Sequence, residues 1–141
     1  MRNLVVILII SAFIWSCANT SKPLDENQKP PLATQKKTDS ADEWEITVFD
    51  TEYESFVASR AQLKSMFTES SLKSRNTILV TEWNSRFYSG ANPNFYEVAI
   101  DYDPKENYGF DFEYRLYQFF VYCNWKYGIR FTGLRAVDKT R

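Results

Sequence analysis

The stretch FDFEYRLYQFFVYCNWKY, residues 110–127, decides how the rest of this chain can fold. On a helix of about 3.6 residues per turn, one face collects most of its apolar side chains: Phe112, Leu116, Phe119, Phe120, Cys123 and Tyr127. A second stripe is more polar: Asp111, Arg115, Gln118, Tyr122 and Lys126. A strand pattern fits only Phe110 to Leu116, because apolar residues then follow one another without alternation. Gly128 comes next and suits a helix C-terminus. The pattern therefore predicts one amphipathic helix over Phe110–Tyr127.

The segments before this helix mix strand and helix patterns. Trp44–Phe49 alternates as a strand does, and Asp50 or Thr51 can cap a helix that carries Tyr53, Phe56 and Val57 on its inner side. Thr68 or Ser70 can begin a short helix around Leu72.

The β-branched run Thr77–Trp83 predicts the central strand of the sheet, and Ile129–Phe131 predicts an edge strand. The distance from Trp44–Phe49 to Thr77–Trp83 allows a right-handed crossover and a parallel pair. We therefore expect a mixed α/β fold, a single small domain in which a short sheet carries one long C-terminal amphipathic helix.

The N-terminus has the pattern of a lipoprotein signal peptide. A short positive leader precedes an apolar run, Leu4–Trp15, which is too short to span a bilayer. The run ends in Ile14-Trp15-Ser16-Cys17, which resembles the lipobox of bacterial lipoproteins. That resemblance implies cleavage before Cys17, a diacylglycerol on its sulfur and an acylated amine. An ordinary cleaved signal or an uncleaved anchor is the alternative.

Composition then divides the chain into a signal peptide at 1–16, a lipidated cysteine with a disordered tether at 17–42, a globular aromatic-rich domain at 43–135 and a tail at 136–141. The tether contains three prolines and no aromatic residue, so it offers little apolar surface to a core. Ten Phe, nine Tyr and three Trp lie between Glu43 and Arg135. Such a domain can close a core without disulfides. The second cysteine, Cys123, is expected to be a buried, inert thiol.

Charge and residue usage exclude several classes of function. Loss of residues 1–16 would leave 16 basic and 18 acidic residues, without a basic cluster, so nucleic acid is not an expected partner. The chain has no histidine, which removes the common catalytic triads and imidazole metal sites. We expect no cofactor.

Three ordered motifs lie within the domain: TEWNSR at 81–86, NPNFYEVAIDYDP at 92–104 and YGFDFEYRLYQFF at 108–120. Together they resemble a family of small lipoproteins from diderm bacteria that is known only as a domain of unknown function. The resemblance covers residues 45–131, and its most specific pieces are EWN, IDYDP and the YG pair. It implies a lipid-anchored envelope protein with this domain as its only module, and it assigns no catalytic residue.

Acidic and amide side chains near the ends of the predicted elements are the candidate site. We expect them to lie together at one edge of the sheet: Glu82, Asn84, Arg86, Asp101 and Asp103. Two aspartates two residues apart suggest calcium, but Lys105 and Glu106 stand where an EF-hand loop needs an oxygen ligand and glycine. A carboxylate pair for glycoside cleavage is a second reading. The third is a polar network that holds the turn at Pro104.

Aromatic side chains beside these carboxylates could also bind a glycan, a peptide or a protein. The candidates are Tyr88, Tyr96, Tyr102, Tyr108 and Tyr122. The leading hypothesis is a non-catalytic lipoprotein that binds or scaffolds an envelope protein or glycan and reaches the membrane through lipid on Cys17. Ala18 is not an acidic retention signal, which favours the outer membrane. The alternative is a carboxylate-dependent hydrolase acting on an envelope glycan.

Overall fold

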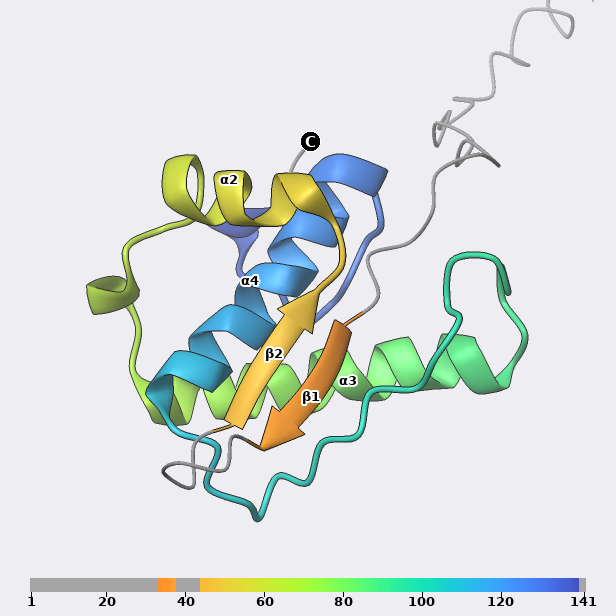
Figure 1. Ribbon diagram of the computed structural model, residues 1–141, viewed down its shortest axis with the longest axis horizontal. Helices are drawn as coiled ribbons and strands as arrows, with labels where there is room; N and C mark the ends of the chain where they lie inside the picture. The colour runs from red at the N-terminus through yellow and green to blue at the C-terminus, as the bar shows by residue number, and fades with distance from the viewer. Residues whose placement is uncertain (1–32, 38–43, 140–141) are drawn as a thin grey trace, which may run out of the picture.

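The computed structural model describes residues 33–37 and 44–139, and these form a helical domain with one two-stranded sheet on a face (Figure 1). In chain order the elements are β1 (Ala33–Lys37), β2 (Trp44–Val48), α2 (Thr51–Ser59), the 3₁₀ turn η2 (Lys64–Met66), α3 (Glu69–Tyr88), α4 (Phe110–Tyr127) and the 3₁₀ turn η3 (Ala136–Asp138). Within the described residues, no helix combines the length and hydropathy needed to cross a bilayer. The expected mixed fold, with a long C-terminal helix packed on the rest, is confirmed.

Helix α4 has the bounds that its periodicity predicts. Asp111 and Glu113 lie in its first turn and Lys126 in its last, which complements the helix dipole at both ends. Gly128 adopts φ 66° and ψ 16°, and its N–H donates to the carbonyl of Asn124. A residue with a side chain is strained in that left-handed conformation, so glycine ends the helix here.

Burial extends around most of α4. Twelve of its residues are buried, including Gln118 and Tyr122, which the sequence pattern assigns to the polar stripe. The thiol of Cys123 is buried and unpaired, and burial raises its pKa well above the ordinary value. The helix is therefore the centre of the domain, covered from several sides.

The predicted strand at Thr77–Trp83 is wrong, because these residues belong to the 20-residue helix α3. The expected start is confirmed: the hydroxyl of Thr68 accepts from the N–H of Ser71 at 3.3 Å. The residues that α3 buries are spaced as on a helix, but a buried asparagine interrupts the apolar pattern: Leu72, Asn76, Leu79, Val80 and Trp83.

The threonine side chains of α3 form hydrogen bonds within the helix. The hydroxyl of Thr77 donates to the carbonyl of Lys73 at 2.9 Å, and that of Thr81 donates to the carbonyl of Thr77 at 2.7 Å. β-Branched residues favour strands only weakly, and packing against α4 overrides that preference.

The sheet also differs from the prediction. β2 pairs with β1 in an antiparallel register that joins Ala33 to Val48 and Lys37 to Trp44. The expected parallel pair with residues 77–83 is therefore wrong. Residues 33–37 lie inside the predicted tether, 17–42, so the prediction of disorder is corrected for these five residues. Ile129–Phe131 is not a strand. The leader, Cys17 and the rest of the tether lie outside the described residues.

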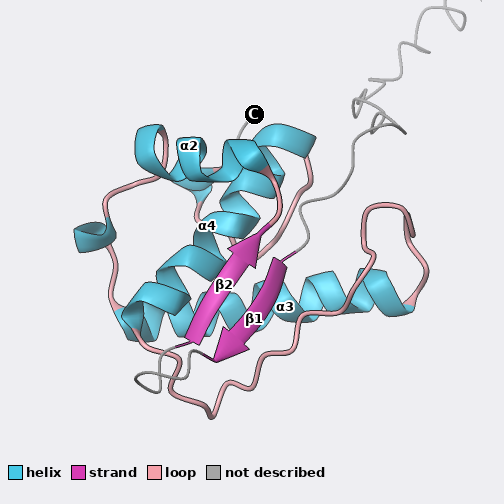
Figure 2. Cartoon of the chain, viewed as in Figure 1, coloured by secondary structure: helices cyan, strands magenta, loops and turns pink. Residues whose placement is uncertain are grey.

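The covering elements meet α4 through aromatic side chains. Trp83 of α3 packs against Phe119 and Phe120 of α4, with ring centroids 5.3 and 6.2 Å apart. From α2, Tyr53 and Phe56 pack against Tyr122 at 5.6 and 5.3 Å. Figure 2 shows the long loop between α3 and α4 running back beside α3 to reach the start of α4. The indole N–H of Trp83 donates to the carbonyl of Val98 in that loop at 2.9 Å.

Truncation of Leu116 to alanine should lower the free energy of unfolding by about 2–5 kcal/mol, because its fully buried side chain would leave a cavity inside α4's contacts. Leu63→Ala is the matched control, since Leu63 is 73% exposed and its loss should cost less than about 0.5 kcal/mol. Denaturant unfolding measures both. Equal effects for the two variants would contradict the central place of α4.

Candidate functional site

The structure places the five predicted site residues in separate contacts. On α3, Glu82 accepts from the N–H of Thr132 at 2.9 Å and from the Thr132 hydroxyl. Arg86 donates to the carbonyl of Arg130 at 2.7 Å and to the hydroxyl of Tyr96 at 2.9 Å. One turn of α3 thus binds the backbone of the C-terminal segment at residues 130 and 132.

Arg75 extends the same arrangement by donating to the carbonyl of Gly133 at 3.0 Å. Arg75, Glu82 and Arg86 lie seven and four residues apart, which puts them on one face of α3. They hold the backbone at 133, 132 and 130, in that order. These charged side chains therefore fasten the chain that follows α4 along the length of α3.

Asn84 points to a different segment, the loop between α3 and α4. Its amide donates to the carbonyl of Ile100 and accepts from the N–H of Ile100, both at 2.8 Å. Both polar groups of one loop residue are thereby satisfied by one side chain. Asn84 fixes the returning loop against α3.

The two aspartates belong to the exposed turn at Pro104. Asp103 accepts from the N–H of Lys105 at 2.9 Å, and its own N–H donates to the hydroxyl of Tyr108 at 2.8 Å. Asp101 is exposed. In residues 44–139, no hydrogen bond or ion pair joins any two of the five candidates. The sheet edge expected to gather them is helix α3 instead, and Glu82, Asn84 and Arg86 make their contacts with other residues.

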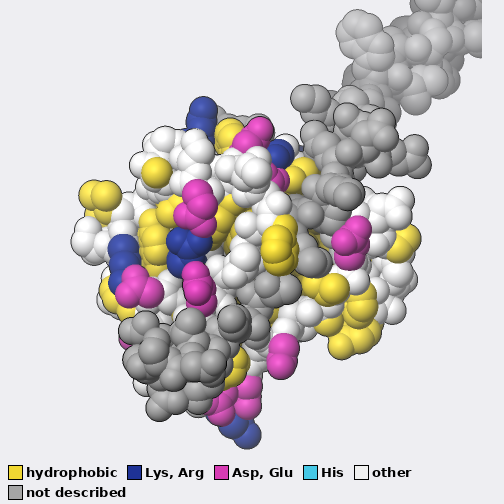
Figure 3. Space-filling view, viewed as in Figure 1, with side chains coloured by type: hydrophobic (Ala, Val, Ile, Leu, Met, Phe, Trp, Pro, Cys, Tyr) yellow, Lys and Arg dark blue, Asp and Glu magenta, His cyan; other side chains and the backbone are white. Residues whose placement is uncertain are grey.

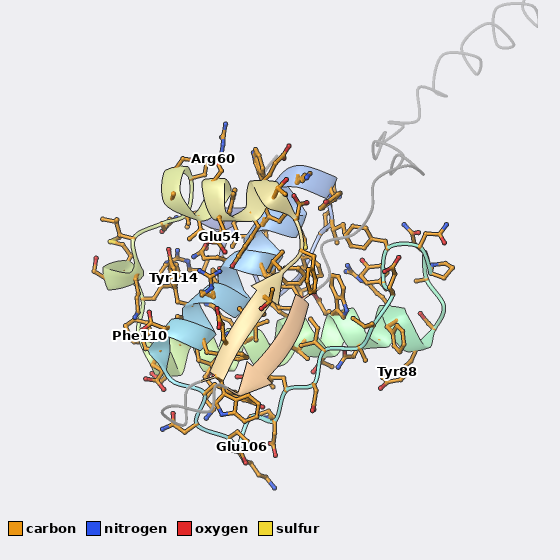
Figure 4. The ribbon with its side chains drawn as sticks, in the orientation of Figure 1. Glu54, Arg60, Tyr88, Glu106, Phe110 and Tyr114 are labelled. Atoms are coloured by element: carbon orange, nitrogen blue, oxygen red, sulfur yellow. The ribbon has the colours of Figure 1, made fainter. Side chains whose placement is uncertain are left out.

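Metal and aromatic binding sites can be assessed in the same way. Over the described part of the chain, no three acidic or cysteine side chains come together as a metal-binding group. Of the five candidate tyrosines, Tyr88 is exposed at the end of α3 (Figure 4), Tyr102 is partly buried and the other three are buried. The tyrosines therefore do not supply a broad aromatic surface.

A buried carboxyl group that the sequence did not single out lies between α3, α4 and the loop. Glu113 accepts from the Asn76 amide at 2.7 Å and from the Tyr102 hydroxyl at 3.0 Å. Burial raises its pKa, and these two hydrogen bonds partly offset the rise. Both donors are uncharged. The carboxyl group of Glu113 thus joins α3, α4 and the loop in the interior.

Exposed charges are arranged in small pairs of opposite sign. Arg115 pairs with Glu54, and Lys64 pairs with Asp111. On the face seen in Figure 3, blue and magenta side chains accordingly lie next to one another rather than in separate fields. Such a surface provides little long-range attraction for a highly charged partner.

One pocket lies where the end of α2, the middle of α4 and η3 meet. Its volume is about 180 Å³, and Phe56, Val121, Trp125 and Val137 provide apolar walls. Gln118 and Asp138 are its buried polar residues. The amide nitrogen of Gln118 is buried and has no hydrogen-bond partner. Sequence spacing could not reveal this pocket, because its walls come from three separate segments.

Asp138 of this pocket is already bound on several sides. Its carboxylate accepts from Arg135 Nε and from the Tyr117 hydroxyl, both at 2.6 Å. Burial first, with the bond to Asp138 adding to it, raises the pKa of Tyr117 to about 12. Tyr117 therefore stays a protonated donor at neutral pH, and Arg135 neutralises the charge of Asp138.

A second, partly buried ion pair holds α2 to the end of α4. Asp50 caps α2 by accepting from the N–H of Glu52 at 3.0 Å, and it also accepts from Lys126 Nζ at 2.7 Å and the Tyr127 hydroxyl at 2.8 Å. Burial alone would raise the pKa of Asp50, but the hydrogen bonds, that of Lys126 foremost, outweigh it and lower the pKa to about 2. The carboxylate is thus favoured in the folded state.

We expect Asp50→Asn, which keeps a capping oxygen, to lower the free energy of unfolding at pH 7 by roughly 2 kcal/mol. The ordinary pKa of 3.8 exceeds the folded one, so this stabilisation is present above about pH 4 and is lost as the pH falls toward 2. Urea unfolding from pH 7 to pH 2 measures the difference between the two proteins. Glu54→Gln removes a more exposed pair and should cost below about 1 kcal/mol. A pH-independent difference for Asp50→Asn would contradict the assignment.

Comparisons with known proteins place the chain in a family without giving an activity. No curated protein and no solved structure matches it. Residues 4–139 match a family described as "Family of unknown function (DUF6146)". The match spans nearly the whole sequence and confirms the resemblance to a domain of unknown function. The chain therefore belongs to this family of unknown function.

Proposed function

We propose that this chain is a lipoprotein of the cell envelope, anchored in the outer membrane by lipid on Cys17, and that its domain binds an envelope partner without catalysing a reaction. The apolar leader ending in Ile14-Trp15-Ser16-Cys17 supports the anchor. The two-stranded sheet and helices α2, α3 and α4 support a module that presents a surface and the pocket beside α2.

The binding assignment rests on the hydrogen bonds that the acidic side chains already accept within the protein. Hydrolysis of a glycan by two carboxylates requires them to face each other across the substrate, about 5–10 Å apart. The pocket beside α2 holds one carboxylate, Asp138, whose oxygens accept hydrogen bonds from Arg135 and Tyr117. Glu82 and Glu113 are likewise engaged with Thr132 and with Asn76 and Tyr102.

Carboxylates that accept these hydrogen bonds hold segments together, and protonating them in an acid–base step would weaken those contacts. A ligand in the pocket meets apolar walls and one unpartnered amide instead. These features favour recognition over acid–base chemistry.

Replacement of Cys17 by serine should abolish fatty-acid labelling and release the protein from the membrane fraction, because the thioether cannot form. Labelling with radioactive palmitate followed by fractionation measures both effects. Cys123→Ala is the matched control: it removes the other cysteine and should keep the label and the membrane location. Persistent labelling of the Cys17 variant would show that the anchor is elsewhere.

The intact lipoprotein should recover a partner from solubilised envelope and should release no reducing ends from envelope glycans. The two readouts are affinity capture followed by mass spectrometry, and a reducing-sugar assay on the same material. Asp138→Asn serves as the variant for the second readout. Sugar release that disappears in this variant would replace the binding proposal by the hydrolase alternative.

A further inference from the structure

The pocket between α2, α4 and η3 has the size of a small organic group. Its volume of about 180 Å³ somewhat exceeds the cavity of about 150 Å³ that holds a benzene molecule in an engineered protein. Two of its lining residues are exposed, Val137 and Arg60, which Figure 4 labels at the end of α2. A compact body can therefore enter while the remainder of a larger molecule stays outside.

Gln118 provides the pocket with a hydrogen-bond donor that has no acceptor among the described residues. The residue is 1% exposed, and its Nε2 has no hydrogen-bond partner. A buried donor without a partner is unfavourable, so such a group commonly has a ligand or an ordered water.

Gln62 and Asp138, the other acceptor side chains around the pocket, are paired with Arg135 and Tyr117 rather than with Gln118. Gln62 accepts from Arg135 Nη2 through its side-chain oxygen at 2.6 Å. Asp138 accepts from Arg135 and Tyr117. In the part of the chain that the structure describes, no oxygen accepts a hydrogen bond from Gln118 Nε2, so a ligand oxygen can take that place.

Charge at the pocket selects the kind of acceptor. The guanidinium of Arg60 lies 4.9 Å from the ring centroid of Trp125, and it takes part in no ion pair of residues 44–139. Asp138 on the other wall is neutralised by Arg135. One uncompensated positive charge therefore remains, and it can pair with an anionic oxygen.

The walls select the rest of the ligand. Phe56 and Trp125 present rings whose centroids are 5.2 Å apart, and Val121 adds a buried aliphatic surface. Val137 is 73% exposed at the edge, an apolar position that a bound ligand would cover. Apolar walls with a few placed polar groups are typical of small-molecule sites.

We propose that this pocket binds a carboxylate attached to a compact apolar or aromatic body. Gln118 Nε2 donates to a carboxylate oxygen, Arg60 compensates the charge, and Trp125 and Phe56 contact the body. This assignment rests on the proposed binding function and gives its ligand class. A free aromatic acid and the C-terminal residue of a peptide share this chemistry.

The test is a titration of the full-length protein, followed through the ¹H–¹⁵N signals of the Trp125 indole and the Gln118 amide. The probes are benzoate, N-acetylphenylalanine and the matched neutral compounds benzamide and N-acetylphenylalanine methylamide. Each acid should bind at least tenfold more tightly than its neutral partner. Saturation by both acids identifies free acids as a source, whereas saturation by N-acetylphenylalanine alone identifies a peptide C-terminus.

Two variants test the assigned donors. Gln118→Leu keeps a side chain of similar size without the amide and should weaken acid binding at least tenfold. Arg60→Met keeps an apolar stem at an exposed position, so it should fold normally and should reduce the preference for the acid over its neutral partner to less than threefold. Arg60→Met decides the matter if Gln118→Leu does not fold.

Three results would overturn the inference: no shift of either signal with any acid, equal binding of acid and neutral partner, or unchanged binding by the Arg60 variant. The first would mean that an ordered water alone occupies the site next to Gln118. Continued recovery of an envelope partner in that case would leave the proposed function intact while removing this pocket from it. Absence of both the signal shifts and partner recovery would contradict this inference and the proposed function together.

Discussion

The structure depends on the burial of α4 around most of its circumference. An amphipathic helix needs cover on one side, but here twelve of eighteen positions are buried. A helix that is apolar on most sides must be surrounded by other elements. α3, α2 and β2 provide this cover, and the segment after Gly128 closes it by following α3. Large aromatic rings fill the contacts, which lets a domain of this size form a core without disulfides.

Burial so extensive also places polar side chains of α4 in the interior, and their fates differ. Glu113 binds Asn76 and Tyr102, and Asn124 donates to the carbonyl of Ile129 at 2.7 Å. Both join α4 to a neighbouring segment. Gln118 keeps an amide nitrogen without a partner and faces the pocket. The contrast within one helix is the reason to assign structural roles to the first two and a ligand to the third.

Sequence patterns correctly predicted the elements whose apolar spacing and capping residues match the structure that they form. The apolar spacing and Gly128 gave the bounds of α4, and Asp50 marked the start of α2 as its capping contact requires. Residues 77–83 misled because β-branched side chains suggest a strand, whereas the buried Asn76 concealed the helical spacing. β1 was missed because its sequence, ATQKK, is polar and lacks the alternation of a strand. Its hydrogen-bonded partner is the single strand β2. Lipid on Cys17 stays a prediction, since that residue lies outside the described part.

The site was beyond local patterns for a further reason. Glu82, Asn84 and Arg86 are close in sequence, yet a helix turns Asn84 toward Ile100 and the other two toward residues 130–132. The pocket, by contrast, joins residues 56–62, 118–125 and 137–138, which only the packing of α2 and η3 on α4 brings together. Native-state hydrogen exchange tests that packing most directly. The backbone amides of Leu116, Phe120 and Cys123 should exchange only through global unfolding, with protection equal to the full free energy of unfolding. Exchange of these amides through a local opening, while α3 stays protected, would contradict a fold built around α4.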